Sequence, residues 1–146
     1  MEIFIARIFK NDRYMLSQTL QRAIRRLAFR YVDKIESRKC HFTFIVRRNR
    51  IISFGFNRIY YTHPLANKFE FRYNDIHSEL AAICRFPHSL KELKDYDIIN
   101  VRLKRDNNLY GLARPCSKCI KMLHYYGVFE IYYSNEMGGF SHEQIL

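Results

Sequence analysis

Hydrophobic positions in the first third of the chain recur every three or four residues. They are Leu16, Leu20, Ile24, Leu27, Tyr31 and Ile35. Because an α-helix has 3.6 residues per turn, this spacing predicts a helix over about residues 14–36 with one buried face. Ser17 is suited to cap its first turn. Arg22, Arg26 and Arg30 follow at steps of four on another face of this basic N-terminal helix, with Arg25 beside them.

The pattern then changes to short apolar runs separated by polar turns. Residues 41–46 and 51–56 are rich in aromatic and β-branched side chains and flank a polar turn, which predicts a β-hairpin. Residues 98–103 and 128–133 predict two further strands. Residues 57–74 look irregular, and irregular segments of this length are often functional.

Two more helices are expected between these strands. Asp75 is a plausible N-cap for a helix through residue 84. Pro115 is suited to the first position of a helix that ends before Gly127. The resulting order, α-β-β-α-β-α-β, predicts a sheet layered with helices in one α/β domain over residues 1–146.

Composition and charge narrow the class of protein. Hydrophobic residues make up 48% of the 146 residues, which excludes a disordered chain. No stretch reaches the roughly 18 apolar residues of a membrane span, and no signal peptide is recognisable. We therefore expect a cytoplasmic protein whose four cysteines are core residues or metal ligands rather than disulfides. Residues 1–60 hold 14 Lys and Arg against 4 Asp and Glu, which favours a surface that attracts phosphates or nucleic acid.

Four residues at two predicted helix starts indicate a metal-dependent enzyme. Cys116 and Cys119 are three positions apart in the first turn of one helix, so both thiolates can bind one metal ion. His77 supplies an imidazole, and one His with two Cys leaves the fourth position of Zn²⁺ open for water. Glu79 matches the general acid/base carboxylate of the zinc-deaminase signature H-x-E…P-C-x-x-C, provided that the metal lies beyond the helix end.

A structural zinc is the alternative for these ligands. Its fourth ligand would come from Cys40, His63, Cys84, His88 or His124. Such a site would suit a nucleic-acid-binding module without activity, but it leaves Glu79 and the Pro-Cys start unexplained. Cys84 lies on the apolar face of its helix and is expected to be a packed core thiol.

From residue 42 to 133 the chain resembles the cytidine deaminase superfamily, and within it the deoxycytidylate (dCMP) deaminase-like proteins of phages and large viruses. The resemblance rests on 55–57, 62–65, 76–80, 113–119 and 127–134. It implies a three-layer α-β-α fold with a central mixed five-stranded sheet. It also implies location in the host cytoplasm if the protein is viral. It also implies that Asn57 contacts the sugar of a bound nucleoside. Ser78 departs from the pattern, because Ala is usual between the His and the Glu.

The sequence leaves two kinds of substrate possible, both of which carry an amine-bearing base. The resemblance favours a small nucleotide, with dCMP converted to dUMP, and Arg114 is a candidate for its phosphate. The basic N-terminal part instead favours a polynucleotide deaminase that acts on C or A in RNA or single-stranded DNA. Assembly into a homo-oligomer is compatible with the sequence. The C-terminal residues 137–146 carry no pattern that predicts a helix or a strand.

Overall fold

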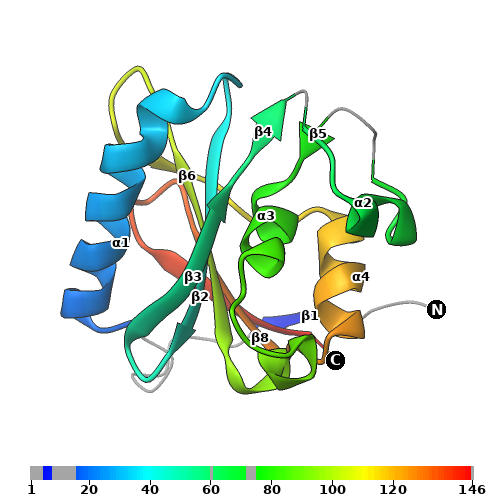
Figure 1. Ribbon diagram of the computed structural model, residues 1–146. Helices are drawn as coiled ribbons and strands as arrows, with labels where there is room; N and C mark the ends of the chain where they lie inside the picture. The colour runs from blue at the N-terminus through cyan, green and yellow to red at the C-terminus, as the bar shows by residue number, and fades with distance from the viewer. Residues whose placement is uncertain (1–4, 8–15, 60, 72–74, 146) are drawn as a thin grey trace.

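A mixed β-sheet with helices on both faces forms the body of the protein (Figure 1). The computed structural model describes residues 5–7, 16–59, 61–71 and 75–145. The strands of the sheet are β1 (Ile5–Arg7), β2 (Cys40–Arg47), β3 (Arg50–Phe56), β6 (Asp97–Leu103), β7 (Tyr110–Gly111), β8 (Glu130–Ser134) and β9 (Phe140–Ile145).

The strand order is β1-β9-β8-β6-β2-β3, and β7 pairs with β6 beside this path. Among the pairings that the structure describes, β6 and β8 run parallel and the others antiparallel. The five longer strands, β2, β3, β6, β8 and β9, confirm the predicted mixed five-stranded sheet. The short strands β1 and β7 extend it.

The helices confirm the three-layer arrangement. α1 (Gln18–Tyr31) covers one face of the sheet, and α3 (Ser78–Cys84) and α4 (Ser117–Tyr125) cover the other (Figure 1). Smaller elements are η2 (Val32–Lys34), α2 (Pro64–Lys68) and η3 (Leu90–Asp95), together with a two-stranded sheet of β4 (Arg58–Ile59) and β5 (Asp75–Ile76). No helix among the described residues is long and apolar enough to cross a membrane.

Alternation along β2 divides the interior into two apolar clusters. Phe42, Phe44 and Val46 pack with the buried face of α1, whereas Ile45 packs with α3 and α4. This is the period of two expected for a strand that is covered on both faces. The hairpin prediction is confirmed, because β2 and β3 pair antiparallel through a turn at Arg48 and Asn49.

The bounds of the three predicted helices need correction. The helix expected over about 14–36 spans 18–31; residues 14 and 15 lie outside the described part, and Ser17 caps it by accepting from the Leu20 amide at 3.1 Å. It ends early because the chain must turn so that Ile35, in extended conformation, enters the core. Asp75 is not an N-cap, since it pairs with Ile59 in the β4–β5 sheet and α3 begins three residues later. Pro115 is not the first residue of α4 either, because Cys116 is the N-cap and the helix begins at Ser117.

Gly55 allows α3 to lie directly on the sheet. A Cβ at this position would stand 2.3 Å from the Ala82 backbone nitrogen and 2.6 Å from the Ala81 carbonyl carbon. Any side chain would therefore push α3 away from β3. The absence of a side chain at Gly55 therefore determines where the residues at the N-terminus of α3 lie.

Candidate active site

The three predicted metal ligands meet where α3 and α4 begin. His77 is the N-cap of α3, Cys116 is the N-cap of α4, and Cys119 lies in the first turn of α4. One ligand atom from each falls within a group whose members are all within 4.8 Å of one another. The Nδ1 atom of His77 is 3.6 Å from Cys116 Sγ and 3.5 Å from Cys119 Sγ.

These distances fit one tetrahedral zinc ion. With Zn–S near 2.3 Å and Zn–N near 2.0–2.1 Å, a tetrahedral angle places the sulfur and nitrogen about 3.6 Å apart. Among the described residues the group contains three ligands and no fourth His, Cys, Asp or Glu. The donor set therefore matches a zinc site with one open position rather than a closed structural site.

The two thiols differ strongly in their proton affinity. The hydrogen bond from Cys119, together with that from His77, lowers the pKa of Cys116 to about 3. Burial, followed by the neighbouring Cys116, raises the pKa of Cys119 well above its ordinary value. The hydrogen bond with Cys116 raises the pKa of His77. Because a metal ion binds thiolates, its binding must release the proton that Cys119 holds at neutral pH.

Glu79 is buried in the first turn of α3 and lies outside the ligand group. Its Oε1 accepts from Asn100 Nδ2 at 2.7 Å, and its Oε2 is 3.2 Å from the Ser78 hydroxyl. His77 has extended backbone angles (φ −74°, ψ 153°), so the helical separation of residues i and i+2 does not apply to it. His77 and Glu79 can therefore line the same cavity, and both do.

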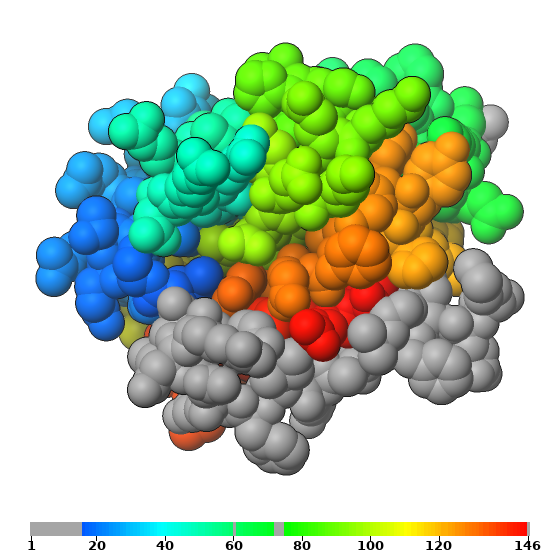
Figure 2. All heavy atoms as spheres, turned by 90° about the horizontal axis from the view of Figure 1, so that it is seen from below, coloured from blue at the N-terminus to red at the C-terminus, as the bar shows by residue number. Residues whose placement is uncertain are grey.

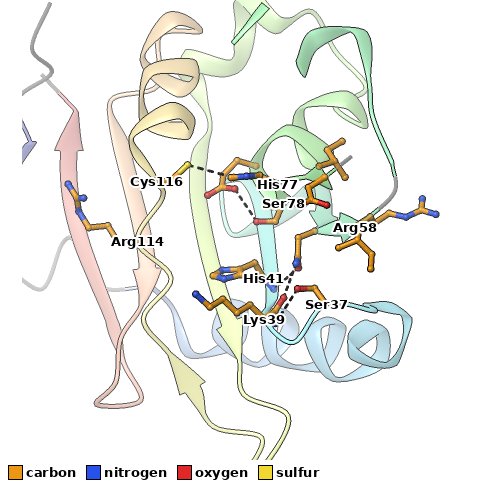
Figure 3. Close-up of a pocket in the computed structure, with 13 residues that line it drawn as sticks. Ser37, Lys39, His41, Arg58, His77, Ser78, Arg114 and Cys116 are labelled. Carbon is orange, nitrogen blue, oxygen red and sulfur yellow. Dashed lines mark hydrogen bonds between the residues drawn. The ribbon is translucent and has the colours of Figure 1, made fainter. Parts of the chain in front are cut away.

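A cavity of about 350 Å³ opens beside these residues (Figure 3). His41 on β2 and Lys39, which precedes this strand, lie opposite His77 and Cys116 in this view. Burial, and then the charges of Arg102 and Lys39, lower the pKa of His41 to about 4, so its imidazole is neutral at pH 7. The sequence alone did not single out Lys39 or His41, because a lone His or Lys near a strand end carries no distinctive signal.

Asn57 and Arg114, the two predicted substrate contacts, also line the cavity. The Asn57 side chain accepts from the His41 amide at 2.9 Å and donates to the Lys39 carbonyl at 2.8 Å. Arg114 donates to buried Glu143 on β9 at 3.2 Å and points away from the other labelled residues in Figure 3. Asn57 thus holds the start of β2 in place, while the guanidinium of Arg114 is already paired.

The fold is that of the cytidine deaminases. A dCMP deaminase of the cyanophage S-TIM5, in complex with dCMP and dUMP, matches with a TM-score of 0.54 and 19% identity over 82% of this chain and 83% of that one. Its apo form matches with a TM-score of 0.53 and 17% identity over 82% and 85%. A cytidine deaminase from Burkholderia pseudomallei matches with a TM-score of 0.53 and 16% identity over 84% and 91%. No protein-family model and no curated protein matches the sequence.

Proposed function

We propose that the protein is a zinc-dependent hydrolytic deaminase that converts dCMP to dUMP. The observation that carries this proposal is the position of Glu79, a buried carboxylate that lines the same cavity as His77 and Cys116 without belonging to the ligand group. A carboxylate in that position can move protons, which a structural zinc site does not require. The similar phage enzyme, which is described in complex with dCMP and dUMP, supports the choice of substrate.

The chain's own residues suit each part of this hydrolysis. His77, Cys116 and Cys119 would hold a zinc ion, whose Lewis acidity makes water nucleophilic near neutral pH. Glu79 accepts a proton from the attacking water and delivers it to the ring nitrogen of cytosine. It then transfers the second proton to the departing amine, so that cytosine and water become uracil and ammonia.

Substrate contacts are assigned to the other side chains of the cavity. Its volume of about 350 Å³ is in the range of small-molecule sites. Asn57 Nδ2 has a second hydrogen beyond the one given to Lys39, and this hydrogen can reach a sugar hydroxyl. Because Glu143 pairs with Arg114, we assign the 5′-phosphate to Lys39, with Arg114 as the second candidate.

Lys39 and Arg58 line the cavity, but the arginines that favoured a polynucleotide substrate do not. The arginines of α1 belong to the layer on the far side of the sheet from α3 and α4 (Figure 1). Arg47, Arg48 and Arg50 lie at the opposite end of the β2–β3 hairpin from His41, roughly 20 Å away at about 3.3 Å per residue. A single strand bound at these residues would not enter the cavity directly.

Ammonia release from dCMP, CMP, deoxycytidine and a cytosine-containing oligonucleotide tests the proposed function. We expect turnover of dCMP by the zinc-loaded protein, with little dependence on salt beyond that of one phosphate contact. Turnover confined to the oligonucleotide and lost steeply with salt would support the polynucleotide deaminase instead. No release from any of them would contradict deamination of cytosine.

Replacing Lys39 separates recognition of the phosphate from the chemistry. Lys39→Met should raise KM for dCMP about tenfold and leave KM for deoxycytidine unchanged, because only dCMP carries the charge that Lys39 attracts. Lys91→Met, an exposed lysine of η3 outside the cavity, is the matched control and should change neither value. An equal rise for both substrates would show that Lys39 acts on the shape of the cavity rather than on the phosphate.

A further inference from the structure

Four buried polar side chains contact one another next to the cavity, and none of them is a predicted metal ligand. They are Thr43 on β2, Asn100 on β6, and Ser78 and Glu79 on α3, with exposed fractions of 1%, 2%, 2% and 6%. Burying polar groups costs free energy unless each finds a hydrogen-bond partner. Their contacts with one another therefore decide what the cluster can do.

The contacts form a closed ring. Thr43 Oγ1 is 2.7 Å from Asn100 Oδ1 and 2.8 Å from Ser78 Oγ. Asn100 Nδ2 is 2.7 Å from Glu79 Oε1, and Ser78 Oγ is 3.2 Å from Glu79 Oε2. Thr43 and Asn100 are direct partners in the β2–β6 register, so the ring is built on the rigid centre of the sheet.

Donor and acceptor chemistry determines the direction of the ring at Asn100. The Oδ1 of Asn100 can only accept, so the hydroxyl of Thr43 must donate to it. This bond turns the NH₂ group of Asn100 toward Glu79. Without Thr43 the Oδ1 of Asn100 would lose this donor, and the amide would be held less firmly against Glu79.

Ser78 connects Thr43 with Glu79 on the other side of the ring. Its Oγ lies 2.8 Å from Thr43 Oγ1 and 3.2 Å from Glu79 Oε2. Because a hydroxyl has one hydrogen, Ser78 can donate to the Glu79 carboxylate while Thr43 donates to Asn100.

We propose that Asn100, oriented by Thr43, is a positioning residue that holds Glu79 in place for proton transfer. This inference rests on the proposed deaminase function and deepens it. The same contacts also stabilise the junction of α3 with the sheet, so a useful test must separate the position of Glu79 from general stability.

The decisive variants are at Thr43, because they leave Glu79 and Asn100 in the chain. Thr43→Val keeps the volume but removes the donor to Asn100. We expect kcat for dCMP to fall about tenfold with KM within about twofold, because a misplaced proton carrier slows chemistry more than binding. Thr43→Ser retains the hydroxyl and should restore kcat to within about twofold of the wild type.

Ser53→Ala is the matched control. Ser53 is also a buried hydroxyl on a strand, and it donates to the Ala82 carbonyl of α3 at 2.9 Å without touching Glu79. It should lower the melting temperature in a similar way to Thr43→Val, with kcat unchanged. Equal losses of kcat in Ser53→Ala and Thr43→Val, or no rescue by Thr43→Ser, would overturn the positioning role.

A crystal structure of the Thr43→Val protein gives a readout that does not depend on activity. We expect the Asn100 amide displaced and its contact with Glu79 lengthened or lost, whereas Ser53→Ala should keep the contact at 2.7 Å. An undisturbed Asn100–Glu79 contact in Thr43→Val would overturn the inference. If the wild type released no ammonia from dCMP, the proposed substrate would be contradicted, and the crystallographic comparison would still decide the positioning role.

Discussion

The two faces of the central strands differ in what they bury. On the side of α1, β2 and β6 present only apolar residues to the core, among them Phe42, Phe44 and Val101. On the side of α3, the same strands bury Thr43 and Asn100. A helix that only needs to be held in place requires apolar contacts alone. Polar residues buried in the middle of a strand therefore mark the face on which the chemistry is expected.

The largest expected effect on stability lies on the α1 face. Phe44 is fully buried and stacks between Phe42 and Phe54, with ring centroids at 6.5 and 5.9 Å. Phe44→Ala should lower the free energy of unfolding by about 4 kcal/mol, measured by urea denaturation. The folded fraction should keep the kcat of the wild type. Phe29→Ala, an exposed residue of α1, is the control and should cost less than about 1 kcal/mol.

If Phe44→Ala instead reduced kcat in fully folded protein, the two faces of the sheet would not have separate effects on stability and on activity. Thr43→Val, at the adjacent position of the same strand, is the opposite case. In this variant we expect a larger effect on kcat than on the free energy of unfolding. This pair of neighbouring positions is therefore the sharpest comparison of the two faces.

Gly55 should affect both stability and activity. A methyl group there must displace the backbone of α3, so Gly55→Ala should cost about 3 kcal/mol and also lower kcat by moving Glu79. Gly139→Ala is the matched control, because the nearest atom to its added Cβ is 3.9 Å away. Wild-type stability and activity in Gly55→Ala would mean that α3 does not depend on this close contact.

The smallest expected effect concerns acid stability on the site face. The pKa of His41 is about 4 in the folded protein, below its ordinary value of 6.5, so the unfolded chain binds more protons between these pH values. Stability should therefore fall as the pH is lowered from 6.5 to 4, by about 2 kcal/mol for this group after discounting for solvent screening.

His41→Gln should remove that part of the pH dependence. Urea denaturation at pH 7.5 and 4.5, with a chelator present so that zinc release does not contribute, measures the difference. A variant that lost as much stability as the wild type over this interval would show that His41 is not the group that titrates.

Much of the fold could be predicted because its long elements have clear periods. The helix spacing from Leu20 to Ile24 and the alternation around Phe44 survive in the structure. Short elements could not be predicted, since two-residue strands such as β4 and β5 are determined by their partners rather than by their own residues. β9 escaped detection because its sequence, FSHEQI, is mostly polar and pairs with β8 at the edge of the core.

The residues of the candidate site likewise fall into a group that the sequence predicts and a group that it does not. His77, Glu79, Cys116 and Cys119 carry a spacing that can be recognised in sequence, and the structure brings them together. Thr43, Asn100, His41 and Lys39 have no such spacing, because strand pairing brings them near the site from distant parts of the chain. The sequence made Arg114 a candidate for binding the phosphate. Only the structure shows that its guanidinium forms an ion pair with Glu143.

Glu79→Gln tests the central claim most directly. The variant keeps the size and burial of the side chain but cannot carry a proton, so zinc content should stay near one ion per chain while ammonia release from dCMP falls by at least about 100-fold. Both quantities are measured on the same preparation. Retained zinc with dCMP turnover at the wild-type rate would contradict the assignment of Glu79 as the proton carrier.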